Sequence, residues 1–232
     1  MQIVRRFLKN KKLVVAIVII APLALAAITM LLFSNLRYSA DAGCTTEVPL
    51  YKQTASPWGD DAYGYKDEAR REPATIASSG CGPTSLAMVL AYLMKNPDMK
   101  PDAAARYCLQ HNYRPPGGGT DPACFDAYAR EKGFRAEQID ANRAKQLLRQ
   151  SIPIIMVVKN CQIGADGRGR YTGSRDDTGG HYIVLKKIRQ ATVDGQEKTI
   201  VEINDPNKNN LWDYPENIFG SCAKRGYWYI HR

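Results

Sequence analysis

The longest apolar stretch of the chain runs from Leu13 to Phe33 and contains no charged residue. At about 1.5 Å per residue, a helix of this length crosses the hydrocarbon core of a bilayer. Five basic residues precede the stretch, Arg37 follows it, and residues 1–37 contain no acidic residue. Because positive charge is retained on the cytoplasmic side, this pattern predicts a single-pass membrane protein with a cytoplasmic N-terminus.

The predicted topology divides the chain into four parts. These are a basic cytoplasmic tail over 1–12, a transmembrane anchor over 13–33, a stalk over 34–50 and a folded domain over 51–232. Two alternatives remain open: Ala40-Asp41-Ala42 resembles a signal-peptidase site, and Gly43-Cys44 resembles the end of a lipoprotein signal. Cleavage at the first site would give a secreted protein. The anchor and the cleaved signal peptide both place the folded domain outside the cytoplasm.

The first half of this domain has the hydrophobic pattern of helices. Gly82-Pro83 is typical of a helix start, apolar residues then recur at helical spacing, and Asn96-Pro97 ends the pattern. Three further helices are expected, over 101–111, from Asp121-Pro122 to Gly133, and near 142–150.

The second half has the pattern of strands. Ile152 to Val158 is a short apolar run that suits a buried strand. Tyr182–Ile188 and Lys198–Asn204 flank Asp194-Gly195, which is typical of a hairpin turn, and Gly226–His231 supplies a last strand. Helices followed by an antiparallel sheet predict an α+β domain.

The net charge of +9 comes mostly from the N-terminal region. Residues 1–37 contribute +6, so residues 38–232 contain 26 basic and 23 acidic side chains. This small excess, without basic clusters, does not suit a phosphate-binding surface, and we expect no nucleic-acid partner.

Six cysteines fit an oxidising compartment. None forms a CxxC pair and the chain has three histidines, so we expect no metal site and no cofactor. A disulfide between Cys108 and Cys124 is expected, because both should lie on neighbouring helices. A second disulfide, between Cys161 and Cys222, is the weaker expectation.

Cys81 is the candidate nucleophile. It lies in Ser79-Gly80-Cys81-Gly82-Pro83-Thr84-Ser85, directly before the first predicted helix. A helix N-terminus presents free N–H groups and a partial positive charge, which favour the thiolate over the thiol. The alternative is a structural or disulfide-bonded cysteine.

His181 and Asp205 are the candidate partners of that thiol. His181 follows Gly179-Gly180 and opens one strand of the predicted hairpin, and Asp205 follows the other strand. If the two strands pair, their open ends meet, and the carboxylate could hold the second nitrogen of the imidazole. The alternatives are a surface histidine and an ordinary Asp-Pro turn.

These segments, in this order, resemble the bacterial C39-like peptidases of the papain-like superfamily. The resemblance covers most of residues 48–231 and is most specific over Ile76 to Val89, with support from Gly180 to Leu185 and from Asn204-Asp205-Pro206. It implies a papain-like cysteine peptidase fold, in which N-terminal helices pack on a C-terminal antiparallel sheet. It also implies that Cys81 is the nucleophile, His181 the base and Asp205 its orienting partner. Gln53 matches the glutamine that donates to the oxyanion hole.

We therefore expect a membrane-anchored, extracytoplasmic thiol peptidase that hydrolyses peptide or amide bonds in a peptide or protein substrate at the cell envelope. Two alternatives remain open. The same thiol could pass the acyl group to an amine, as an acyl transferase or transpeptidase does. The domain could also be a catalytically inactive peptide-binding module, although a binder has no need of Cys81, His181, Asp205 and Gln53 together.

Overall fold

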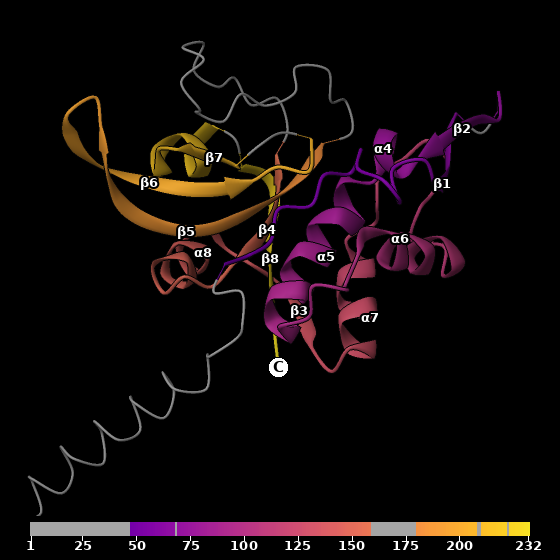
Figure 1. Ribbon diagram of the computed structural model, residues 1–232, viewed down its shortest axis with the longest axis horizontal. Coiled ribbons are helices and arrows are strands. Elements are labelled where there is room, and N and C mark those ends of the chain that lie inside the picture. The colour runs from indigo at the N-terminus through magenta and orange to yellow at the C-terminus, as the bar shows by residue number, and fades with distance from the viewer. Residues whose placement is uncertain (1–46, 68, 159–179, 208–209, 222) are drawn as a thin grey trace, which may run out of the picture. The chain divides into compact units, whose positions relative to one another are not determined.

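Figure 1 shows the computed structural model of the protein, which describes residues 47–67, 69–158, 180–207, 210–221 and 223–232. Within these ranges, no helix has both the length and the apolar character needed to cross a membrane. The expected cytoplasmic tail, the expected anchor and the expected Cys161–Cys222 disulfide lie outside the described residues.

Glu47 to Arg232 form one compact unit. Val48 is buried, and the Nδ2 of Asn204 donates to the carbonyl oxygens of Val48 and Pro49, each at 3.0 Å. Residues 47–50, the end of the expected stalk, therefore pack as part of this unit, because an apolar side chain and two backbone carbonyls find partners there.

One layer of the unit is helical and consists of α4 (Ile76–Ser79), α5 (Cys81–Met94), α6 (Pro101–Gln110) and α7 (Ala123–Glu131). Helix α5 starts one residue before the expected Gly82-Pro83. It ends at Met94, and Lys95 then takes the left-handed conformation with φ of 54°. Every residue from Gly82 to Ala91 is buried, which makes α5 the central helix of the layer.

The other layer is a six-stranded antiparallel sheet with the order β3-β8-β4-β5-β6-β7. Its strands are β3 (Arg135–Ile139), β4 (Ile154–Val158), β5 (His181–Val193), β6 (Gln196–Asn204), β7 (Asn210–Asp213) and β8 (Ala223–His231). The predicted hairpin of β5 and β6 is confirmed. It turns at Asp194-Gly195, where both residues have positive φ, and it extends away from α5, α6 and α7 (Figure 1).

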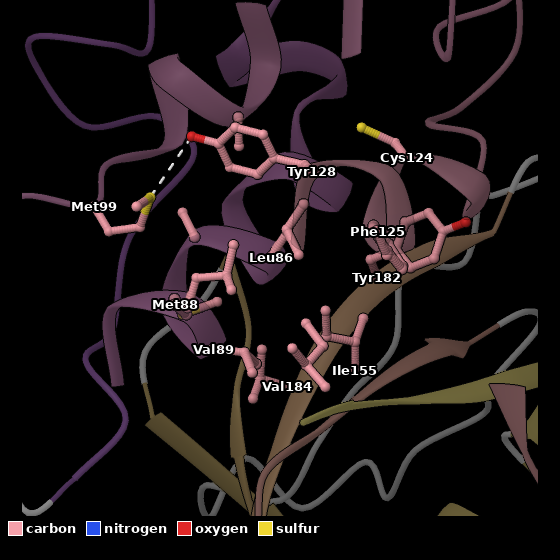
Figure 2. Close-up of a cluster of buried hydrophobic side chains, with 14 of the residues drawn as sticks. Leu86, Met88, Val89, Met99, Cys124, Phe125, Tyr128, Ile155, Tyr182 and Val184 are labelled. Atoms are coloured by element: carbon pink, nitrogen blue, oxygen red, sulfur yellow. Dashed lines mark hydrogen bonds between the residues drawn. The ribbon is translucent and has the colours of Figure 1, made fainter. Parts of the chain in front are cut away.

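Strand β4 is buried on both faces, which explains its unbroken apolar sequence. Alternate residues of a strand point to opposite faces. Ile155 and Val157 belong to the core that contains α5 and α7, and Ile154, Met156 and Val158 belong to the core around α8 (Ala141–Arg149). Figure 2 shows the first of these cores, where Leu86 and Val89 of α5 lie near Ile155 and Val184 of the sheet.

The order of elements along the chain differs from the expected helices first and sheet second. β1 (Ala62–Asp67) and β2 (Glu72–Thr75) form a separate antiparallel pair before α4, and β3 lies between α7 and α8. β3 and β7 are the edge strands of the main sheet, and most of their side chains are exposed or half-buried. Such polar edge strands lack the apolar runs that identify β4 in the sequence.

The expected disulfide between Cys108 of α6 and Cys124 of α7 is confirmed. Both cysteines are fully buried, and the bond closes a loop between residues separated by 16 positions. It therefore restrains the segment between the two helices, residues 111–122.

Removal of this disulfide is expected to lower the free energy of unfolding by about 3 kcal/mol, because the unfolded chain regains the entropy of an open loop. The double variant Cys108→Ala/Cys124→Ala, compared with the wild type in urea unfolding, measures this. Mild reductant should destabilise the wild type and leave the double variant unchanged. Equal stability of the two proteins would contradict a structural role for the bond.

Candidate active site

Cys81 is the first residue of α5, where α5 meets the short helix α4. The N–H of Gly80 donates to the carbonyl oxygen of Ile76 at 2.7 Å, and a Cβ added at Gly80 would lie 2.6 Å from that oxygen. A Cβ added at Gly82 would lie 2.4 Å from Oγ1 of Thr120. Both glycines are therefore required by close packing, which explains the Gly-Cys-Gly sequence in structural terms.

The thiol of Cys81 is half-buried, and Cys81 is the free cysteine of the described chain. Helix α5 is 14 residues long, and its N-cap, Gly80, supplies no capping side chain. The N–H groups of the first turn, and the positive end of the helix dipole, therefore lie next to the thiol.

His181 and Asp205 meet at the open end of the β5–β6 hairpin. His181 is the first residue of β5 and pairs with Val158 of β4, and Asp205 follows the last residue of β6. The Nε2 of His181 lies 2.8 Å from Oδ1 of Asp205, and the two residues are 4% and 1% exposed. The same Oδ1 accepts the backbone N–H of Asn207 at 2.8 Å, which fixes the carboxylate.

The imidazole of His181 also lies close enough to Cys81 to interact with it, so the structure brings together three of the four expected site residues. Since Nε2 faces Asp205, Nδ1 is the ring nitrogen left for the thiol. Burial alone lowers the pKa of His181, but the hydrogen bond to Asp205, the close approach of Cys81 and the negative charges of both raise it to about 10. The site therefore favours the positively charged imidazolium of His181.

The raised pKa of His181 predicts a dependence of stability on pH. The contribution of the charged imidazolium to the free energy of unfolding is fully present below about pH 6.5, the ordinary pKa of histidine. It is lost as the pH rises towards about 10. The difference in free energy of unfolding between the wild type and His181→Gln should therefore shrink from pH 6 to pH 10 in urea titrations. A difference that grows over this interval would contradict the electrostatics of the site.

Gln53 connects the loop after Asp205 to the helix before Cys81. Its backbone N–H donates to the carbonyl oxygen of Pro206 at 2.9 Å, and its side-chain Nε2 donates to that of Ala77 at 2.6 Å. Gln53 is 3% exposed, and among the described atoms its Oε1 has no hydrogen-bond partner. The structure thus places the fourth expected residue beside the other three, with its amide donor turned towards α4.

A cavity of about 530 Å³ opens beside Cys81. One wall comes from the segment between α6 and α7, including Gly119 and Thr120, and the other from the sheet, including Tyr182 and Trp228. Apolar and aromatic surface next to a nucleophile is suited to holding a substrate side chain.

Sequence reasoning missed the contribution of the segment between α6 and α7. Thr120 packs against Gly82, its Oγ1 lies 2.8 Å from the hydroxyl of Tyr63, and its carbonyl oxygen accepts the hydroxyl of Tyr182 at 3.0 Å. The Gly117-Gly118-Gly119 run indicates a turn and carries no signal for a wall of the cavity. Only the Cys108–Cys124 pairing points to an ordered segment here.

Within the described residues, no three histidine, cysteine or carboxylate side chains are arranged to hold a metal ion. The sequence from residue 45 to 229 matches the model of the Peptidase_C39 like family. The chain belongs to this family. No match was found among curated proteins.

Three solved structures are similar to this C39-like chain. A double-glycine-motif protease from an AMS/PCAT transporter, solved with its leader peptide, is 17% identical, with 82% of this chain and 95% of that chain covered and a TM-score of 0.45. A C39-like peptidase from Bacillus anthracis is 15% identical, with 82% and 97% covered and a TM-score of 0.49. The Pseudomonas avirulence protein AvrPphB is 9% identical, with 66% and 90% covered and a TM-score of 0.34.

Proposed function

We propose that the protein is a cysteine peptidase that hydrolyses peptide or amide bonds through Cys81, His181 and Asp205. The observation that carries the proposal is the buried His181–Asp205 pair, which lies close to a half-buried free thiol at the start of α5. Membership of a C39-like peptidase family supports it.

In this mechanism the thiolate of Cys81 attacks the carbonyl carbon of the scissile bond, and a carbon–sulfur bond forms. The imidazolium of His181 gives its Nδ1 proton to the leaving amine as the carbon–nitrogen bond breaks. Water then attacks the thioester while Nδ1 takes one of its protons. The carboxylic acid leaves, and the carbon–sulfur bond breaks to restore the thiolate. Asp205 holds Nε2 throughout.

The oxyanion of each tetrahedral intermediate needs donors close to Cys81. We assign this role to the backbone N–H of Cys81, which a first-turn position leaves without an intrahelical acceptor, and to the side chain of Gln53. The Nε2 of Gln53 has two hydrogens, and its bond to Ala77 uses one.

The proposal includes a location: residues 13–33 anchor the chain, and the peptidase domain lies outside the cytoplasm. The Cys108–Cys124 disulfide supports it, because such bonds persist in oxidising compartments. A membrane-impermeant maleimide should therefore label Cys81 of the full chain on intact cells. Labelling that requires lysis would contradict this location.

The direct test of the activity uses the full chain in detergent with a peptide mixture. Mass spectrometry should find new carboxyl termini among the products and an acyl adduct on Cys81 after acid quenching. A variant with Cys81→Ser serves as the control and should give neither. Peptides that stay intact, in a preparation whose Cys81 is confirmed free, would contradict the proposed function.

The cavity provides a further prediction. Apart from the neighbouring residues in the chain, no atom of the described residues lies within 4 Å of a Cβ added at Gly119, so Gly119→Trp places an indole in the cavity without a clash at its base. We expect KM for a cleaved peptide to rise about tenfold, the cost of losing one buried side chain, while Gly119→Ala stays near the wild type. The rate at which a small reagent alkylates Cys81 should be the same in both Gly119 variants as in the wild type. An unaltered KM in Gly119→Trp would show that substrate avoids this cavity.

A further inference from the structure

Arg114, between α6 and α7, is a buried cation without an acidic partner among the described residues. It is 8% exposed, its Nε donates to the carbonyl oxygen of Tyr63 at 3.3 Å, and its Nη1 donates to that of Pro115 at 3.5 Å. Arginine is seldom buried without a negative charge nearby, because desolvation of the guanidinium costs several kcal/mol. A negative charge close to Arg114 would offset this desolvation cost.

Packing connects Arg114 to the nucleophile. Its Cζ lies 5.2 Å from the centroid of the fully buried Tyr63 ring, and the hydroxyl of Tyr63 lies 2.8 Å from Oγ1 of Thr120. Thr120 in turn fills the space where a side chain at Gly82 would lie, next to Cys81. Arg114, Tyr63 and Thr120 thus form a continuous buried wall behind the first turn of α5.

The charges of the site indicate what Arg114 balances. Asp205 and the Cys81 thiolate are negative and the His181 imidazolium is positive, so these three groups together have a net charge of −1. Arg114 brings the sum to zero. Burial lowers the pKa of Arg114, and its interactions with Tyr63 and with Cys81 act in the opposite direction, so the guanidinium and the sulfur are close enough to interact.

Two other charged groups face this region. Lys52 interacts with Asp205 and remains partly exposed. Asp121 lines the cavity with Cys81, but it is exposed, and its Oδ1 accepts the N–H of Ala123. Solvent screens both charges more than it screens the buried Arg114.

We propose that Arg114 is a positioning residue whose buried positive charge stabilises the Cys81 thiolate, with Tyr63 and Thr120 holding it behind the first turn of α5. This role rests on the proposed function, since only a thiol that reacts as a thiolate needs the charge. Arg114 itself does not line the cavity and is not assigned a contact with substrate.

The test is the rate of iodoacetamide alkylation at Cys81 in the full chain as a function of pH, followed by peptide mass spectrometry. Arg114→Gln removes the charge, Arg114→Met removes it and fills the same apolar volume, and Arg114→Lys keeps it. Arg106→Gln is the matched control, because Arg106 lies on α6, is exposed and pairs with Asp102 at 3.2 Å.

The neutral variants are expected to move the midpoint of the alkylation profile upward by about 0.5–1 pH unit, a three- to tenfold loss of thiolate below the midpoint. Arg114→Lys and Arg106→Gln should keep the wild-type midpoint. If circular dichroism shows that Arg114→Gln does not fold, the midpoint of the alkylation profile is measured in Arg114→Met. A wild-type midpoint in a folded neutral variant would overturn the inference, as would an equal shift in Arg114→Lys.

The alkylation rates distinguish failure of the proposed function from failure of the role of Arg114. If wild-type Cys81 reacts no faster than an ordinary thiol at any pH, the proposed function fails. If wild-type Cys81 is reactive at low pH and the neutral variants match it, the peptidase proposal stands and the role of Arg114 is wrong.

Discussion

Cys81→Ala is expected to reduce peptide hydrolysis by a factor of at least about 10⁴, below the detection limit of most assays. The variant removes the sulfur that forms the acyl-enzyme, and neither His181 nor Asp205 can replace it as a nucleophile. The measurement is kcat/KM for a peptide that the wild type cleaves, with the full chain in detergent.

Two controls separate chemistry from folding in this experiment. Alanine fits the first turn of α5, so the variant should keep the wild-type circular dichroism spectrum and bind the peptide with a similar Kd. Binding that persists without turnover locates the defect in the reaction. Unchanged turnover in Cys81→Ala would disprove the mechanism.

His181→Ala should lower kcat by a factor of about 10²–10⁴, the usual contribution of a general acid–base group. The variant leaves the thiol in place but removes the group that protonates the leaving amine. His111, which is exposed on the C-terminal side of α6 and stacks on Tyr107, provides the matched control, and His111→Ala should retain wild-type kcat.

Asp205→Asn should cause a smaller loss than His181→Ala, because the amide still accepts a hydrogen bond from Nε2 but no longer holds the positive imidazolium by charge. In a plot of kcat against pH, the fall at high pH should then occur at a lower pH than in the wild type. The reason is that the negative charge of Asp205 helps to raise the pKa of His181. An equal loss in His111→Ala and His181→Ala, or a fall at high pH that Asp205→Asn does not move, would contradict the assigned roles.

The sequence predicts the parts of the site that depend on local pattern. Gly82-Pro83 and the apolar residues after it define α5, and so place Cys81 at a helix N-terminus. Asp194-Gly195 defines the hairpin, whose strands pair Val184 with Asn204 and so bring its two ends together. In both cases the residues of one short segment determine the local structure.

Other parts of the site depend on contacts between segments far apart in the chain. Tyr63 and Thr120, 57 residues apart, meet through one buried hydrogen bond, and Arg114 is buried where it packs on Tyr63. No periodicity marks such residues, and arginine in a loop segment ordinarily indicates an exposed side chain. The edge strands β3 and β7 escaped prediction for a related reason, since pairing with a neighbour, not burial, defines them.

The most direct test of the account is the rate at which a neutral alkylating reagent modifies Cys81 of the full chain between about pH 4 and about pH 9. Peptide mass spectrometry separates this adduct from those on other cysteines. We expect fast modification well below pH 7 in the wild type and slow modification in His181→Ala, because the imidazolium stabilises the thiolate. Modification that rises only near pH 8.5, as for an ordinary thiol, and that His181→Ala does not change, would contradict a thiolate–imidazolium active site.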